Sequence, residues 1–239
     1  MLKLYIYILT WHILIVLSSC NTFCPSFKEN NETIYGIDVS HYQNEKAKID
    51  WLKVSQNKNP KIEFAYIRST MGSNGKDTAF QYNYENAIKN QIPVGVYHYY
   101  RPNENAKSQF DNFATHNTKI GNLPPVIDIE QKSKFGNKKL IQELSVFLEL
   151  IEQNYTKPII YTQQKFYNMY LRNQFKEYDF WIARQSGIEN SPKNNQPQKE
   201  PILLDNRCPL IWQYSGTGTI SGIKGKVDLN ITNNIFWAE

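Results

Sequence analysis

The sequence predicts an α/β fold, a barrel of the (β/α)8 type whose second half is irregular and has fewer helices. Eight short runs rich in β-branched and aromatic residues recur along the chain, and the first five begin about thirty residues apart. Helical patterns lie between these early runs, which is the spacing of βα units around a parallel sheet. The last runs follow one another too closely for intervening helices.

Each predicted element has its own local signal. The predicted strands, in chain order, are IYGIDVS (34–40), FAYIRST (64–70), VGVYHYY (94–100), PPVIDIE (124–130), PIIYT (158–162), DFWIAR (179–184), LIWQYS (210–215) and KVDLNI (226–231). Apolar residues recur at helical spacing over 138–154, and a second helix is predicted over 78–90 with Thr78 as its cap. The Gly-rich stretch between 215 and 226 predicts a hairpin or loop with antiparallel pairing, and the polar stretch 186–201 predicts a surface loop.

The N-terminal residues have the layout of a secretory signal peptide, with one early lysine, an apolar run, small residues and no acid. The apolar run from Leu4 to Leu17 is shorter than the ~20 residues that a transmembrane helix needs. An uncleaved membrane anchor is the alternative. The residues from Leu17 to Cys20 resemble a bacterial lipobox, which implies that Cys20 is lipidated. We therefore expect a signal peptide over 1–19, a tether over 20–33 and one domain over 34–239, in an exported protein anchored by lipid to the bacterial cell envelope.

Two further cysteines, Cys24 and Cys208, fit an exported protein. They could form a disulfide in an oxidising compartment. Equally, Cys208 could be an ordinary buried thiol.

Composition and motifs exclude several classes of function. The formal net charge of +5 over 239 residues, without clustered Lys and Arg, argues against a nucleic-acid partner. The 16 tyrosines suit a groove for a polar ligand such as a sugar, because tyrosine both packs and hydrogen-bonds. The sequence has no HExxH metal spacing, no GxSxG elbow, no Gly-rich phosphate loop and no Cys nucleophile near a His. We expect a monomer with no metal and no cofactor.

The candidate site lies where the predicted strands end, because the C-terminal ends of the strands meet at one mouth in such a barrel. Asp128 and Glu130 are two positions apart, so their side chains face the same way. Asp38 and Asp228 come from the first and last predicted strands. The other strands end at or near Arg68, Tyr97, Tyr161, Arg184 and Gln213.

Paired carboxyl groups among aromatic residues point to glycoside hydrolysis. One acid must donate a proton to the leaving oxygen, and a neighbouring carboxylate and partial burial raise its pKa for that purpose. The other acid stays ionised and stabilises positive charge.

Structural interpretations compete with this one. Asp38 or Asp228 alone could be a helix cap or a turn residue. The acids at 128 and 130 could instead form a buried salt-bridge network with Arg68 and Arg184. We interpret His98 as a packed, hydrogen-bonding residue rather than as a base.

Six motifs in this order resemble glycoside hydrolase family 25, the N-acetylmuramidases or Chalaropsis-type lysozymes. They are YGIDVSHYQ, VGVYHYYRP, PPVIDIE, PIIYT, IWQYS and KVDLN, and the resemblance extends from about Ile34 to Trp237. It implies a flattened, irregular, TIM-like barrel of eight strands. It also implies that peptidoglycan glycan strands are the substrate, cleaved at the β-1,4 bond between N-acetylmuramic acid and N-acetylglucosamine.

The resemblance also implies residue roles. Glu130 matches the proton donor, and Asp128 matches the partner that orients the 2-acetamido group of the substrate. Asp38 and Asp228 match the other two carboxyl groups of the site. The remaining expected groove residues are Tyr97, Tyr161, Gln213 and Arg68.

The chain departs from the family at one position. Many members have Lys-Ala-Thr-Glu-Gly after the second strand, whereas this chain reads Arg68-Ser69-Thr70-Met71-Gly72. Met71 replaces the glutamate, which removes any substrate contact that this acid makes.

Three rival interpretations remain open on the sequence, and one of them, a secreted structural barrel with no ligand, leaves the acids and aromatic residues at the mouth unexplained. A chitinase-like hexosaminidase would use the same fold, although its DxxDxDxE pattern is absent. A lipid-anchored peptidoglycan-binding protein that has lost catalysis is the third, but binding alone does not require four clustered acids.

Overall fold

Eight strands form one closed barrel in the computed structural model, which describes residues 24–27, 33–185 and 196–234. The strand order is β1-β9-β8-β7-β6-β5-β4-β2, and the pairing of β1 with β2 closes the ring. The strands are β1 (Ile34–Val39), β2 (Phe64–Met71), β4 (Val94–Tyr99), β5 (Val126–Asp128), β6 (Ile159–Gln163), β7 (Phe180–Ala183), β8 (Ile211–Gly218) and β9 (Val227–Thr232). The short β3 (Gly75–Lys76) forms a hairpin with β2 outside the ring. All eight predicted strands are confirmed.

The barrel is parallel except at β9. Strand β9 runs antiparallel to both β8 and β1, and the other ring pairings are parallel. Strand β8 continues to Gly218, past the predicted end at 215, because Gly218 pairs with Val227 across the hairpin. The predicted antiparallel pairing in the second half is thus confirmed.

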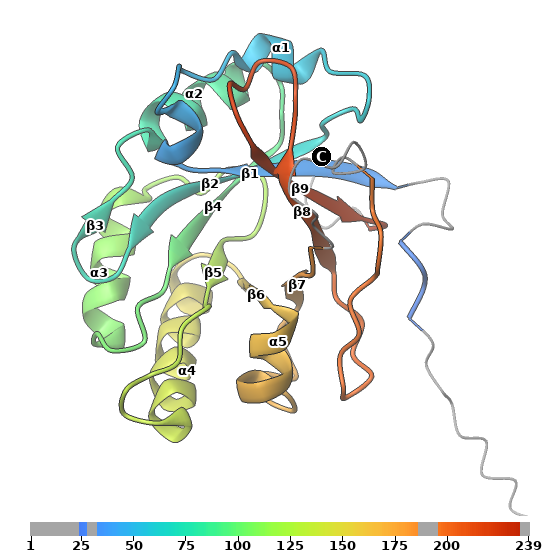
Figure 1. The fold of residues 1–239 in the computed structure, drawn as a ribbon. Coiled ribbons are helices and arrows are strands. Elements are labelled where there is room, and N and C mark those ends of the chain that lie inside the picture. Colours follow the sequence, from blue (N-terminus) through green and yellow to red (C-terminus); the bar gives the residue numbers. More distant parts are fainter. Residues whose placement is uncertain (1–23, 28–32, 186–195, 235–239) are drawn as a thin grey trace, which may run out of the picture.

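Helices cover the outside of the first part of the barrel. They are α1 (Trp51–Ser55), α2 (Phe80–Lys89), α3 (Ala106–His116), α4 (Asn137–Asn154) and the short α5 (Gln164–Phe166), with a 3-10 turn η1 (His41–Asn44) and a π turn η2 (Tyr167–Leu171). Figure 1 shows α2, α3, α4 and α5 following one another around the strands from β2 to β6. Between β7 and β9, the described residues contain no helix.

Helix α2 begins later than the sequence predicts. It starts at Phe80, and the predicted cap at Thr78 is wrong. The Asp77 carboxylate instead accepts the N–H of Ala79 at 2.9 Å. This bond forms a turn ahead of the helix, and the N-cap residue Ala79 makes no side-chain capping bond.

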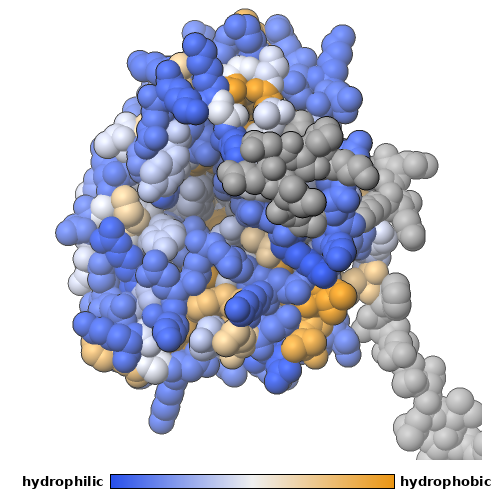
Figure 2. Space-filling view, viewed as in Figure 1, coloured by the Kyte–Doolittle hydropathy of each residue, from blue (hydrophilic) through white to orange (hydrophobic). Residues whose placement is uncertain are grey.

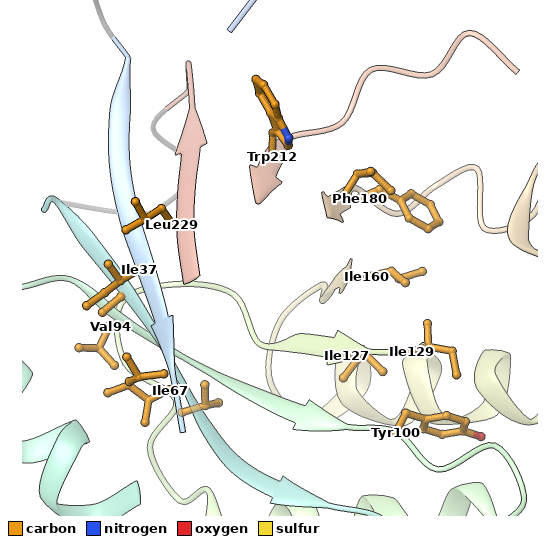
Figure 3. Packing of buried hydrophobic residues seen from close by; sticks show 14 of the residues in the cluster. Ile37, Ile67, Val94, Tyr100, Ile127, Ile129, Ile160, Phe180, Trp212 and Leu229 are labelled. Atoms are coloured by element: carbon orange, nitrogen blue, oxygen red, sulfur yellow. The ribbon is translucent and has the colours of Figure 1, made fainter. Parts of the chain in front are cut away.

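The alternation of strand side chains divides the interior into two layers. Ile37, Val94, Ile127 and Ile160 lie in the larger cluster, which includes residues of the surrounding helices (Figure 3). The smaller cluster consists of the buried residues Phe64, Tyr66, Leu123, Val126, Ile159, Trp181 and Ile211. On β5, Val126 and Ile127 therefore fall in different clusters, as the two-residue period of a strand requires.

His98 belongs to the helix-facing layer and is fully buried. Its ring stacks on that of Phe147 with centroids 4.9 Å apart, and its Nδ1 lies 2.8 Å from Thr70 Oγ1. Burial lowers the pKa of His98 to about 4. The interpretation of His98 as a packed residue is confirmed.

A disulfide joins Cys24 to Cys208. Close by, the Phe27 ring lies 5.9 Å from that of Trp212, and Asn233 Nδ2 donates to the backbone oxygen of Ser26 at 2.9 Å. This part of the predicted tether therefore lies against the barrel.

The predicted signal peptide, Cys20 and the first part of the predicted loop, 186–195, lie outside the described residues. Within the described ranges, every helix is too short or too polar to cross a membrane.

Candidate active site

One cavity of about 430 Å³ brings the predicted site residues together. Its lining includes all eight of them: Asp38, Asp128, Glu130, Asp228, Arg68, Tyr97, Tyr161 and Gln213. The expectation that separate strand ends converge on one mouth is therefore confirmed.

The end of β5 directs two acids into this cavity. Strand β5 begins at Val126, later than predicted, because the two preceding prolines have no N–H to donate to a neighbouring strand. Beyond its last residue, Ile129 N–H still donates to Tyr161 O at 3.0 Å. The extended spacing thus continues past the strand, and Asp128 and Glu130 both line the cavity.

Two further acids face each other across a strand pair. Asp38 on β1 is the register partner of Asp228 on β9. Like charges directly opposite each other in an antiparallel pair are destabilising. Burial and the charges of Asp38 and Glu130 raise the pKa of Asp228 well above its usual value.

Asp38 is held by two amide side chains. Its Oδ2 accepts hydrogen bonds from Gln213 Nε2 at 3.0 Å and Asn230 Nδ2 at 2.8 Å. Burial raises the pKa of Asp38 to about 6, although both hydrogen bonds act to lower it. Asp38 is therefore ionised above about pH 6 and oriented by its partners.

A second layer of donors fixes the orientation of these amides. Gln213 Oε1 accepts from Tyr161 OH at 3.0 Å and from Gln185 Nε2 at 2.8 Å. Asn230 Oδ1 accepts from Trp181 Nε1 at 2.9 Å. Because each amide oxygen is engaged by a donor, each amide nitrogen is turned toward Asp38.

Asp128 has an oxygen without a partner. Its Oδ1 is buried and accepts no hydrogen bond from the described residues. Burial raises the pKa of Asp128 well above its usual value, and the charges of Glu130 and Asp38 add to this effect. A buried polar atom without a partner is costly, so this oxygen is suited to a group of a bound ligand.

Glu130 lies at the edge of the cavity and is only partly buried. Its Oε1 accepts a hydrogen bond from Gln163 Nε2 at 3.1 Å. Its negative charge adds to burial in raising the pKa of Asp38, Asp128 and Asp228.

The alternative salt-bridge network is wrong. Arg68 Nε pairs with Asp77 Oδ2 at 2.9 Å, and Arg184 donates to the backbone oxygen of Glu200. In the described structure neither arginine forms an ion pair with Asp128 or Glu130. The described residues also contain no group of three or more His, Cys, Asp or Glu side chains suited to a metal ion.

Several cavity or support residues were missed by the sequence reasoning. They are Tyr42, Asp77, Tyr99, Trp181, Gln185 and Asn230. The two-residue alternation that links Asp128 to Glu130 also places Asn230 on the same face as Asp228, so this residue could have been found. Asp77 could not have been found in this way, because it follows a short hairpin and contacts Arg68 only in the folded chain.

Met71 lies on the cavity wall, where the family pattern has glutamate. Its sulfur accepts from Arg101 Nη2 at 3.3 Å. Arg101 also pairs with Glu104 at 3.1 Å, so its charge is already balanced without an acid at position 71.

Comparison with known proteins places this geometry among glycosidases. The family model described as glycosyl hydrolases family 25 matches residues 37–223. The uncharacterised protein YegX of Escherichia coli strain K12 is 33% identical over 205 residues, which cover 84% of this chain and 70% of YegX. Lysozyme M1 of Streptomyces globisporus is 31% identical over 215 residues, which cover 84% of this chain and 68% of lysozyme M1. A solved family 25 glycosyl hydrolase from Bacillus anthracis has a TM-score of 0.72 at 31% identity, covering 84% of this chain and 89% of that one.

Proposed function

Because this chain belongs to glycosyl hydrolases family 25 and is a glycoside hydrolase, we propose that it is a lysozyme acting on peptidoglycan. The bond cleaved is the β-1,4 linkage between N-acetylmuramic acid and N-acetylglucosamine. Similarity to lysozyme M1 supports the substrate class. The observation that carries the proposal is the set of four carboxyl groups around one cavity, which includes the unpartnered oxygen of Asp128.

The geometry supports a division of roles. Glu130, which Gln163 holds at the cavity edge, donates its proton to the leaving glycosidic oxygen. The free Oδ1 of Asp128 accepts the N–H of the 2-acetamido group and orients it. Asp38, ionised above about pH 6, stabilises the positive charge that develops on the sugar ring in the transition state.

The test is product analysis. The chain from Asn21 onward is incubated with purified peptidoglycan beside Glu130→Gln, and Glu149→Gln serves as an exposed control on α4. Products are reduced with borohydride, and the new reducing ends are identified by mass spectrometry. We expect reduced N-acetylmuramic acid from the wild type and the control, and a rate lower by several orders of magnitude for Glu130→Gln.

Other products would contradict the proposal in different ways. Reduced N-acetylglucosamine would indicate a glucosaminidase on this scaffold. Binding to the wall without new reducing ends would indicate a binding protein without catalysis. Full activity of Glu130→Gln would refute its assignment as the proton donor.

The enzyme is further proposed to act in the cell envelope, anchored through a lipid on Cys20. The N-terminal sequence pattern supports this localisation, and so does the Cys24–Cys208 disulfide, since disulfides persist in oxidising compartments. Cys24 follows Cys20 by four positions, so the anchor would keep the barrel close to the membrane surface. Cys20→Ala should move the protein to the soluble fraction, and a variant that still sediments with membranes would contradict lipidation.

A further inference from the structure

A second cavity, of about 310 Å³, adjoins the first at Glu130. It is lined by Glu130, Lys132, Gln163, Lys165, Phe166, Met169 and Tyr170. Because Glu130 lines both cavities, a substrate bond positioned at this acid lies at the entrance to the second cavity as well. None of the other residues of the second cavity belongs to the lining of the first.

Two successive strand ends build this second cavity. Lys132 follows the end of β5, and Gln163 ends β6. Lys165 lies in the short α5, directly after β6. The hydrogen bond from Gln163 to Glu130 connects the two strand ends at the junction of the cavities.

The second cavity differs from the first in charge. Lys132 and Lys165 are both exposed, and neither forms an ion pair with any residue in the described part of the chain. Glu130 is the only acid that lines the cavity. Two cations without partners on one cavity attract an anionic group.

The same cavity also offers an apolar surface. The rings of Phe166 and Tyr170 pack with centroids 4.8 Å apart, and Met169 is 59% exposed. The face in Figure 2 is mostly hydrophilic, with hydrophobic residues in small separate groups. A ligand that fits this cavity therefore combines carboxylates with short apolar groups.

We propose that this cavity binds the acidic peptide stem attached to the muramic acid beside the cleaved bond. A neutral polysaccharide has no group for the two lysines. In peptidoglycan, the lactyl group of muramic acid carries a peptide with free carboxylates and alanine methyl groups, which match the cations and the apolar surface. The inference rests on the proposed function and defines its substrate as stem-bearing glycan.

The experiment compares a substrate that bears the stem with one from which the stem has been hydrolysed, which leaves a free lactyl carboxylate on each muramic acid. Peptidoglycan is freed of phosphate-containing polymers with hydrofluoric acid, and half of it is then stripped of peptides by an amidase. The measured quantity is the ratio of kcat/KM on stem-bearing glycan to that on stripped glycan. For Lys132→Gln/Lys165→Gln, we expect this ratio to fall about three- to tenfold, the effect of losing two exposed ionic contacts.

A matched double variant controls for the loss of overall charge. Lys89→Gln/Lys119→Gln removes two exposed lysines that do not line the cavity, and it should keep the wild-type ratio. Raising the salt concentration should lower the wild-type ratio, because exposed ionic contacts are screened.

Each remaining outcome is decisive. An unchanged ratio for the cavity variant, or an equal fall for the control variant, would overturn the inference while leaving the lysozyme activity established. A fall seen only before hydrofluoric acid treatment would assign the lysines to phosphate polymers and overturn it too. If the wild type cleaves neither substrate, the proposed function itself fails.

Discussion

Replacing Asp38 with asparagine should stabilise the protein while removing its activity. Asp38 is 8% exposed, and burial raises its pKa from 3.8 to about 6. At about 1.4 kcal/mol for each pKa unit, this shift means that the ionised Asp38 destabilises the folded state by about 3 kcal/mol. In the asparagine variant, one side-chain oxygen still accepts from Gln213 and Asn230, so the hydrogen bonds remain while the buried charge is gone.

The effect depends on pH in a defined direction. Between pH 3.8 and about 6, folded Asp38 binds a proton more tightly than unfolded Asp38 does, so the free energy of unfolding falls as the pH rises. The penalty is absent below pH 3.8 and complete above about pH 6. Asp38→Asn should therefore gain about 3 kcal/mol at pH 8 and almost nothing at pH 3.5.

Urea denaturation at several pH values measures this gain directly. At pH 8 a rise in Tm of about 6–12 °C should accompany it. Asp50→Asn is the control, because Lys53 lowers the pKa of Asp50 and its neutralisation should not stabilise the protein. A gain for Asp38→Asn that does not change with pH, or a loss at pH 8, would refute the reasoning.

Three further predictions concern the same interior. Asn230→Leu removes a hydrogen-bond donor to Asp38, so the midpoint of the acidic limb of kcat/KM should move to higher pH by about one to two units. An unshifted midpoint would show that Asp38 does not control the acidic limb. Cys24→Ser removes the disulfide to Cys208, which lies 184 residues away, and should lower the free energy of unfolding measured in urea by about 2–5 kcal/mol. Reducing the wild type with dithiothreitol should lower it by a similar amount. The pKa of His98 is depressed to about 4, so between pH 6.5 and 4 the wild type should lose about 3 kcal/mol of unfolding free energy relative to His98→Gln; equal slopes of unfolding free energy against pH for both proteins would contradict this.

Local patterns were sufficient to predict the strands and the paired acids. The period of two residues on β5 placed Asp128 and Glu130 on one side, and the cavity lining confirms it. The close spacing of the last runs predicted the antiparallel hairpin between β8 and β9. These features depend on neighbours within a few residues, and the sequence therefore contains them directly.

Contacts between distant residues escaped the same reasoning. Arg68 was considered as the ion-pair partner of Asp128 or Glu130, but it forms its ion pair with Asp77. Thr78 was expected to cap α2, but the helix has no side-chain cap, and Asp77 instead accepts the N–H of Ala79 just before it. In both cases the outcome depends on which acceptor oxygen lies nearest to the donor after folding, and spacing along the chain does not encode this.

The sequence by itself therefore determined the eight strands, the common face of Asp128 and Glu130, and the catalytic family. Pairing of β1 with β9 set Asp38 opposite Asp228, and closure of the ring between β1 and β2 brought both to the acids of β5. The tertiary structure also decided the pKa values, because desolvation and repulsion between carboxyl groups exist only once separate strands share one cavity.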